Sequence, residues 1–234
     1  MTLITTLKLN QNLAVTVGDG RVNSSGQTTN DDLRKVYMKD NFCIAFAGDT
    51  HVNPTLSQKN LFVPNIIEEY VERYDGNNSL ELIIELIEYL LTQNPNQNTE
   101  LFISCGNQNS VDVHYINLPT PQINTISTSF GLLYSSKSGL PTESVRAQFE
   151  KILNETLSIK ESEILTHLPQ KTEEEIINLL KAFYESVFTE LNPKVQNSIG
   201  ESIDIAVVYS GSGKFEQIEN KTIKEIGEDQ GVNM

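Results

Sequence analysis

The second residue of the chain, Thr2, is the one best suited to covalent chemistry. Removal of Met1 would leave Thr2 with a hydroxyl nucleophile and a free α-amine. An α-amine has an unperturbed pKa of about 7.7–8.0, so part of it is unprotonated near neutral pH. The amine can then act as general base for its own hydroxyl. Such a site also needs a cation held by a carboxylate, and a backbone N–H that receives the oxyanion.

Three short motifs downstream supply groups of these kinds: Gly18-Asp19-Gly20-Arg21, Arg34-Lys35-Val36 and Phe46-Ala47-Gly48-Asp49-Thr50. Each motif alone is a common turn or a solvated basic pair. Their order and spacing are more specific than any one motif. Asp19 lies 17 residues after Thr2 and 16 residues before Lys35.

Together with Thr2, these motifs resemble the proteasome β-subunit superfamily of N-terminal-nucleophile hydrolases. This superfamily includes the peptidase of the bacterial two-component ATP-dependent protease and the bacterial homologue Anbu. The first fifty residues carry the resemblance. It implies an α+β fold, namely a four-layer αββα sandwich of antiparallel sheets, and a threonine-type endopeptidase that uses no cofactor and no metal.

The resemblance also implies roles for individual residues. The Thr2 hydroxyl would attack the scissile carbonyl, and Lys35 would lower the pKa of the Thr2 amine and hydroxyl. Asp19 would be the counter-ion of Lys35, and the Gly48 N–H would form the oxyanion hole. Ser129, in the stretch Thr-Ser-Phe-Gly, resembles the serine that lies near the α-amine in the family.

Four further positions would line the first specificity pocket: Val22, Leu33, Phe46 and Thr50. Phe46 would favour apolar side chains in that pocket. By the same resemblance, the substrate is a peptide or an unfolded protein and the assembly is a homo-oligomeric ring. An ATP-dependent unfoldase is a possible partner.

The chain also departs from the family pattern. Leu3 stands where a second threonine is common, and Asp49 places a carboxylate beside the proposed oxyanion site. Two alternatives therefore stay open: a catalytically silent structural subunit that keeps Met1, and a small-molecule amide hydrolase with the same mechanism. A generic acidic binding domain would explain the composition but not the spacing of Asp19 and Lys35.

Composition narrows the other function classes. The 234 residues carry a net charge of −14 with a pI near 4.6, which argues against binding to nucleic acid or to an anionic membrane. Cys43 and Cys105 lie in apolar runs typical of core thiols. The most apolar window, 80–91, contains three glutamates, so it predicts no membrane span, and the first 17 residues resemble no signal peptide. We therefore expect a cytoplasmic location.

The elements that must position these residues follow from hydrophobic period and turn chemistry. Alternating apolar residues predict a hairpin over 2–17, strands over 33–38 and 42–47 after a polar loop at 23–32, and further strands at 99–105, 111–116, 123–129, 203–209 and 214–218. Helical periodicity predicts helices over 64–74, 80–91, 141–157 and 172–191, with Asn78 as an N-cap, and an acidic tail helix. Pro- or Gly-rich linkers that would divide the chain are absent from the sequence, which predicts one domain over 1–234.

Overall fold

The computed structural model describes residues 2–20, 22–24, 27–30, 33–52, 61–126, 128, 130–135, 139–191, 202–210 and 221–222. Only the backbone is described at 22–24, 27–30, 202 and 221–222. Helices and strands alternate in blocks along the chain, and all the strand pairs of the two large sheets are antiparallel. The prediction of an α+β fold with antiparallel sheets is therefore confirmed.

The first large sheet contains the predicted N-terminal hairpin. Its strand order is β12 (Gly131–Tyr134), β1 (Ile4–Asn10), β2 (Leu13–Asp19), β13 (Ser202–Tyr209) and β14 (Lys221–Thr222). The hairpin turns at Gln11 and Asn12, and its register places Ile4 opposite Gly18. This pairing brings the start of the chain beside the end of β2.

The second large sheet has the order β11 (Asn124–Thr125), β10 (Val111–Asn117), β9 (Thr99–Gly106), β6 (Phe42–Gly48) and β5 (Val36–Lys39). Two small hairpins lie outside both sheets: β3 (Val22–Ser24) with β4 (Gln27–Asn30), and β7 (His51–Val52) with β8 (Leu61–Phe62).

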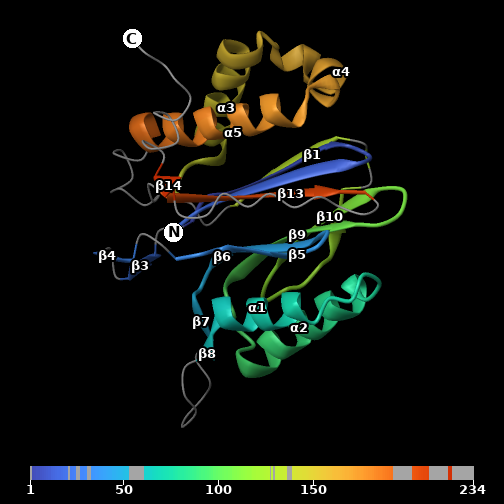
Figure 1. Ribbon diagram of the computed structural model, residues 1–234. Helices are drawn as coiled ribbons and strands as arrows, with labels where there is room; N and C mark the ends of the chain where they lie inside the picture. The colour runs from blue at the N-terminus through green and yellow to red at the C-terminus, as the bar shows by residue number, and fades with distance from the viewer. Residues whose placement is uncertain are drawn as a thin grey trace.

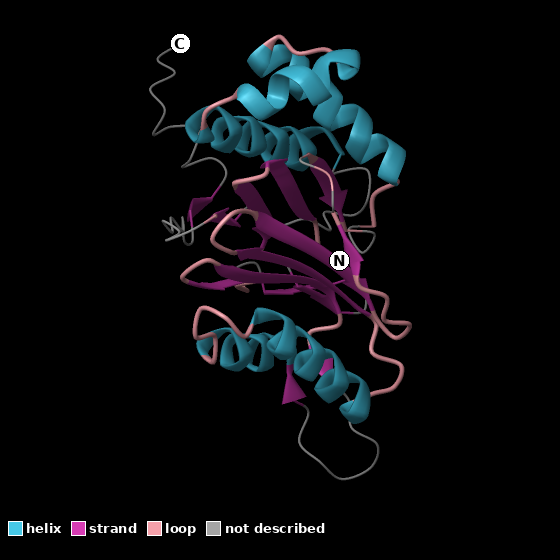
Figure 2. Ribbon diagram, turned by 90° about the vertical axis from the view of Figure 1, so that its right-hand side faces the viewer, coloured by secondary structure: helices cyan, strands magenta, loops and turns pink. Residues whose placement is uncertain are grey.

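The two sheets face each other, and helices cover their outer faces (Figures 1 and 2). Over the first sheet lie α3 (Thr142–Leu157), α5 (Glu173–Ser186) with a π-helical extension (Val187–Leu191), and a short connection made of η2 (Glu161–Glu163), α4 (Ile164–His167) and η3 (Leu168–Gln170). Over the second sheet lie α1 (Val63–Glu72) and α2 (Ser79–Gln93).

Three apolar clusters match this layering. One packs β1, β2 and β13 against α3 and α5, a second packs β6 and β9 against α1 and α2, and a third fills the space between the sheets. Strand alternation explains the division, because Leu3 and Leu7 face the helices while Ile4 faces the other sheet. The apolar stripes of α2 and α5 pack within the chain, which leaves Leu80 and Ile84 of α2 exposed.

Several predicted elements need correction. The polar stretch at 23–32, expected as a loop, contains β3 and β4, and the strand expected at 123–129 is reduced to two residues. Strand β12 and the turns around α4 were not expected, because their few apolar residues have no clear period. Asn78 does not cap α2 with its side chain; its Oδ1 accepts from the Asp75 N–H at 3.1 Å. The expected strand at 214–218 and the tail helix lie outside the described residues.

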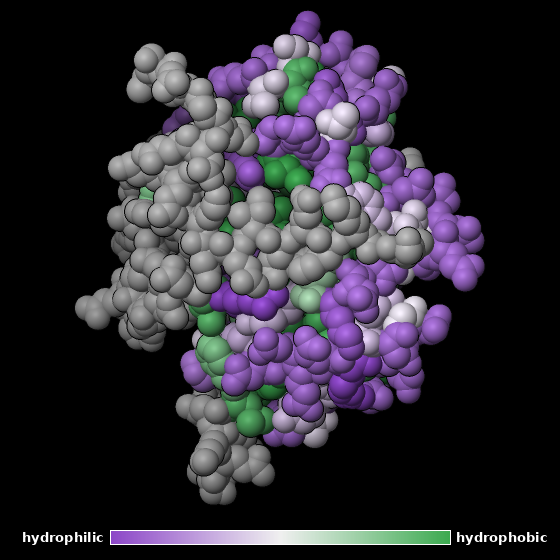
Figure 3. Space-filling view, viewed as in Figure 1, coloured by the Kyte–Doolittle hydropathy of each residue, from purple (hydrophilic) through white to green (hydrophobic). Residues whose placement is uncertain are grey.

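In the part of the chain that the structure describes, no helix is both long and apolar enough to cross a bilayer. On the face drawn in Figure 3, the described surface of the outer helices is mostly hydrophilic.

Candidate functional site

Three of the predicted catalytic residues meet between the sheets. The Lys35 Nζ donates a hydrogen bond to the Thr2 Oγ1 and lies 3.9 Å from the Asp19 Oδ1. All three residues are buried: Thr2 is 3% exposed, Lys35 1% and Asp19 0%. A buried cation is costly unless it is paired. The Lys35 ammonium is therefore held beside the threonine hydroxyl by the Asp19 carboxylate.

Two strands of one sheet and the start of a strand in the other sheet bring these groups together. Thr2 lies two residues before the start of β1, Asp19 is the last residue of β2, and Lys35 directly precedes β5. The hairpin register explains why Asp19 lies close to the start of the chain, because Asp19 is one residue beyond the pair Ile4–Gly18.

Gly18 allows the two sheets to approach at this point. A Cβ atom at Gly18 would lie 2.7 Å from the Ile4 Cδ1 and 3.0 Å from the Val36 Cγ2. Both distances are too short for carbon atoms in contact. The first glycine of the Gly18-Asp19-Gly20 motif therefore has a packing role, which places Lys35 close to the end of β2.

The backbone next to Thr2 is held by polar side chains. The Asp19 Oδ2 accepts from the Leu3 N–H at 2.5 Å. The Ser135 Oγ donates to the Thr2 carbonyl at 2.5 Å and accepts from the Ile4 N–H at 3.2 Å. Ser135 could not be predicted as a site residue, because a serine just after an unexpected strand has no local sequence signal.

A second carboxylate reaches Lys35 from β13. The Asp204 Oδ2 accepts from the Lys35 backbone N–H at 3.3 Å, and Asp204 is 5% exposed. This contact anchors the residue from which the lysine side chain extends. One feature of the sequence could have indicated Asp204, because it is a lone acidic residue within the apolar run 203–208.

Gly48, the proposed oxyanion residue, has a backbone conformation that requires glycine. Its φ is +110°, and a Cβ atom there would lie 2.2 Å from the Asn98 carbonyl oxygen. The Phe46 N–H donates to the Lys35 carbonyl at 3.1 Å. Alternate residues of a strand direct their N–H groups to the same side, so the Gly48 N–H also points toward the β5 side, where Lys35 lies.

The neighbouring acidic residue, Asp49, is directed to the protein backbone. Its Oδ2 accepts from the Asn98 N–H at 3.1 Å, and its own N–H donates to the Asn98 carbonyl at 3.0 Å. These bonds hold the carboxylate that the sequence places beside the oxyanion site.

The predicted specificity residues are distributed differently. Phe46 is fully buried in the cluster beneath α1 and α2, and Leu33 is half-buried against the same cluster. Thr50 shares a 3.0 Å hydrogen bond with the His51 Nδ1. Val22 lies in β3, where only its backbone is described, and Ser129 lies outside the described residues. Among the members of this set whose side chains the structure describes, Leu33 and Phe46 share one apolar cluster.

The two cysteines are core thiols, as expected. Burial raises the pKa of Cys43 to about 12 and that of Cys105 to about 11. Thiols with such values hold their protons at neutral pH and are poor nucleophiles. Within the described ranges, there is no group of three or more residues of the types that hold a metal ion.

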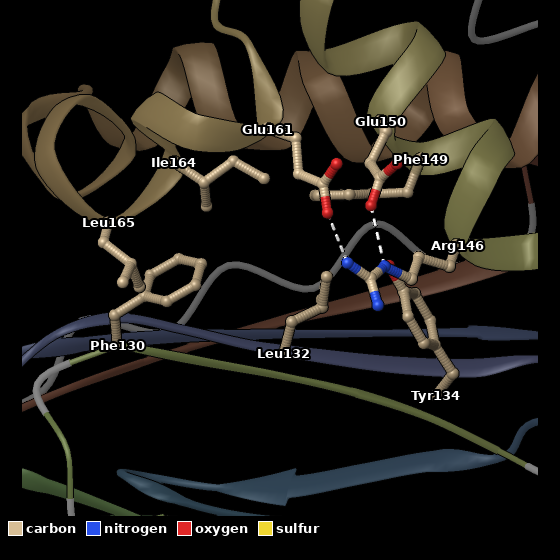
Figure 4. Close-up of a pocket in the computed structure, with 9 residues that line it drawn as sticks. All are labelled: Phe130, Leu132, Tyr134, Arg146, Phe149, Glu150, Glu161, Ile164 and Leu165. Atoms are coloured by element: carbon tan, nitrogen blue, oxygen red, sulfur yellow. Dashed lines mark hydrogen bonds and ion pairs between the residues drawn. The ribbon is translucent and has the colours of Figure 1, made fainter. Parts of the chain in front are cut away.

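A cavity of about 380 Å³ lies on the other side of the first sheet, between β12, α3 and α4 (Figure 4). Nine residues line it: Phe130, Leu132, Tyr134, Arg146, Phe149, Glu150, Glu161, Ile164 and Leu165. Arg146 pairs there with both Glu150 and Glu161. None of the nine belongs to the Thr2 cluster, so the cavity is a separate feature of the helical layer.

A scan against known protein families and a search of curated proteins give no match to this chain.

Proposed function

We propose that the chain is a threonine-type N-terminal-nucleophile peptidase of the proteasome β-subunit type, with Thr2 as nucleophile after loss of Met1. One observation carries the proposal: the buried Lys35 ammonium, paired with Asp19, donates to the Thr2 Oγ1. A buried ion pair costs several kcal/mol in desolvation, so its position at a hydroxyl next to the chain start needs a reason. Activation of that hydroxyl supplies one.

The proposed reaction is acyl transfer. The free Thr2 amine takes the hydroxyl proton while the Oγ1 bonds to the scissile carbonyl carbon. The carbonyl oxygen becomes an oxyanion, which the Gly48 N–H receives. The amine then passes its proton to the leaving nitrogen as the peptide bond breaks, and an ester on Thr2 remains. Water, activated by the same amine, hydrolyses the ester.

In this mechanism Lys35 and Asp19 act electrostatically. The ammonium lies against the Thr2 oxygen and stabilises the negative charge that develops there during attack. Asp19 keeps the ammonium in place, and through the Leu3 N–H it also keeps the backbone of the nucleophile in place.

The arrangement of elements supports the same proposal. Helices cover the outer faces of two opposed antiparallel sheets, which lie between them (Figure 1). This order is compatible with the four-layer αββα sandwich of N-terminal-nucleophile hydrolases, which we propose as the fold. The proposal extends to peptide or unfolded-protein substrates, a homo-oligomeric ring and an unfoldase partner.

Intact-protein mass spectrometry tests the proposal. The untagged chain is measured before and after exposure to a peptide epoxyketone, which reacts with both the hydroxyl and the amine of an N-terminal threonine. We expect a mass without Met1 that gains one inhibitor adduct, located on residue 2 by peptide mapping. Thr2→Ala should keep the fold and gain no adduct. Wild-type-like peptide turnover in Thr2→Ala would exclude Thr2 as the nucleophile.

A second candidate, the catalytically silent structural subunit, is favoured by the low exposure of Thr2, which is 3%. Retained Met1 with no adduct on a folded protein would support this candidate. The third candidate, a small-molecule amide hydrolase, predicts the adduct as well. Turnover of small amides with no cleavage of peptides would identify it.

A further inference from the structure

We propose that Tyr184, on helix α5, is a positioning residue for the Thr2 nucleophile. Its hydroxyl holds the chain at Leu3 and so determines where the Thr2 Oγ1 lies relative to Lys35. The catalytic consequence depends on the proposed function, whereas the positioning itself can be measured without any activity.

The hydroxyl of Tyr184 is fully buried at the start of the N-terminal hairpin. It lies 3.0 Å from the Leu3 carbonyl oxygen, 2.8 Å from the Val17 carbonyl oxygen and 3.2 Å from the Thr5 Oγ1. One O–H can be shared between the two carbonyls, while the Thr5 hydroxyl donates to the Tyr184 oxygen. A single side chain therefore links β1 to β2 at the point where their pairing ends.

The regular backbone pairing of the hairpin ends close to the nucleophile. The last regular pair is Ile4–Gly18, and beyond it the Asp19 N–H donates to the Leu3 carbonyl at 3.2 Å. The Leu3 N–H is bonded to the Asp19 side chain rather than to a backbone carbonyl of β2. Tyr184 thus supplies the shorter bond to the Leu3 carbonyl, one residue from the nucleophile.

Three separate parts of the chain hold residues 2–4. Asp19 of β2 binds the Leu3 N–H, Ser135 after β12 binds the Thr2 carbonyl and the Ile4 N–H, and Tyr184 of α5 binds the Leu3 carbonyl. Only Tyr184 comes from the helical layer. The position of α5 over the sheet is therefore transmitted to the backbone beside Thr2.

The helix is itself well fixed. Thr172 and Glu175 form a capping box at its start, and the Phe183 ring packs edge-on against both Tyr184 and Phe149 of α3, at 5.6 Å and 5.4 Å between centroids. Burial also raises the pKa of Tyr184 well above its usual value, so the hydroxyl keeps its proton and remains a donor at any physiological pH.

The experiment compares two Tyr→Phe variants. Tyr184→Phe removes the hydroxyl that makes three contacts. Tyr134→Phe, the matched control, removes a buried hydroxyl for which the structure describes no hydrogen-bond partner, on a ring whose centroid is 6.2 Å from that of Phe183. Amide hydrogen exchange of residues 3–5 is measured together with the rate and pH profile of epoxyketone labelling at Thr2.

We expect exchange at residues 3–5 to rise at least about tenfold in Tyr184→Phe, because bonds beside these amides are lost. The labelling rate should fall about 10- to 100-fold, since a displacement of about 1 Å can cost that much. Exchange in β9, in the other sheet, should stay unchanged. Tyr134→Phe should match wild type in both readouts.

Wild-type exchange and labelling in Tyr184→Phe would overturn the positioning role. A wild type that takes no label would instead contradict the proposed function, and the exchange measurement would still decide the role of Tyr184. If Tyr184→Phe does not fold on its own, it is measured in a stabilising osmolyte such as sucrose, which favours the compact state without replacing the lost hydroxyl. Wild-type-like exchange at residues 3–5 under those conditions would also overturn the proposal.

Discussion

Two groups of paired charges in this protein have similar chemistry and opposite surroundings. Between the sheets, Lys35 and Asp19 are 1% and 0% exposed, and the atoms of the pair are 3.9 Å apart. Above the cavity, Arg146 is 55% exposed, and its Nε lies 2.7 Å from the Glu150 Oε1. The shorter contact is the weaker candidate for function, because water and ions screen an exposed pair.

Burial, rather than contact distance, therefore distinguishes Lys35 and Asp19 as the candidate pair for function. The cost of removing Lys35 and Asp19 from water is offset only by their mutual attraction and their other contacts. The Arg146 side chain stays largely hydrated, so we expect its removal to change the free energy of unfolding little.

The largest difference is expected between Lys35→Met and Arg146→Met. Lys35→Met leaves the Asp19 carboxylate buried without its cation, so the free energy of unfolding should fall by about 3–5 kcal/mol. Epoxyketone labelling of Thr2 should also be lost. Arg146→Met should leave the unfolding midpoint in urea nearly unchanged. Equal losses in the two variants would remove the basis of the comparison.

A double variant sharpens this result. Lys35→Met combined with Asp19→Leu removes both charges, so it should recover part of the stability that Lys35→Met loses. It should not recover labelling. No recovery of stability would mean that Lys35 stabilises the fold through contacts other than the ion pair.

A smaller difference is expected between two glycines with positive φ. Gly76 lies in an exposed turn with φ +98° and open space where a Cβ would be, so Gly76→Ala should cost about 1–2 kcal/mol from the backbone alone. Gly48→Ala has the same backbone cost and adds a contact of 2.2 Å with the Asn98 carbonyl. It should be the more destabilised of the two in urea unfolding. A smaller loss of stability in Gly48→Ala than in Gly76→Ala would show that the end of β6 can shift and relieve the contact with Asn98.

The smallest effect concerns the cap of α5 and depends on pH. The Thr172 backbone N–H, the Lys171 side chain and the Thr172 hydroxyl, in that order of effect, lower the pKa of Glu175. A lowered folded-state pKa adds stability above the unfolded value of about 4.3, and this is lost as pH falls through the folded value. Thr172→Ala should cost about 1 kcal/mol near pH 7. The difference in Tm from wild type should narrow toward pH 3, and a constant difference would contradict the role of the carboxylate.

Much of the fold could be predicted from local pattern. The N-terminal hairpin, β6, β9, β10 and the four long helices lie close to their expected ranges, because their apolar residues have a clear period of 2 or 3.6. The elements that were missed or changed lack that period. Strand β12 has only four residues, all half-buried, and β3 and β4 consist mostly of polar residues.

The site was predicted in part. Thr2 was named from its residue type next to the chain start, and Asp19 and Lys35 from the family resemblance that their motifs carry; the structure brings the three into contact. Ser135, Tyr184 and Asp204 were not named, since each reaches the site from more than 100 residues away and none belongs to a motif. The roles expected for all the site residues stay predictions, and for Val22 and Ser129 the structure describes no side chain.

The sequence by itself determined which groups are available: a threonine next to the chain start, a carboxylate at a strand end and a lysine before another strand. Local hydrogen bonding and hydrophobic period are short-range properties, so they can be interpreted from neighbouring residues. Only the tertiary structure decided that Lys35 is 1% exposed and that its ammonium meets the Thr2 hydroxyl. It also decided that a tyrosine 181 residues away holds the Leu3 carbonyl. Burial and the pairing of distant groups arise when the two sheets pack, because that is when water is removed from the space between them.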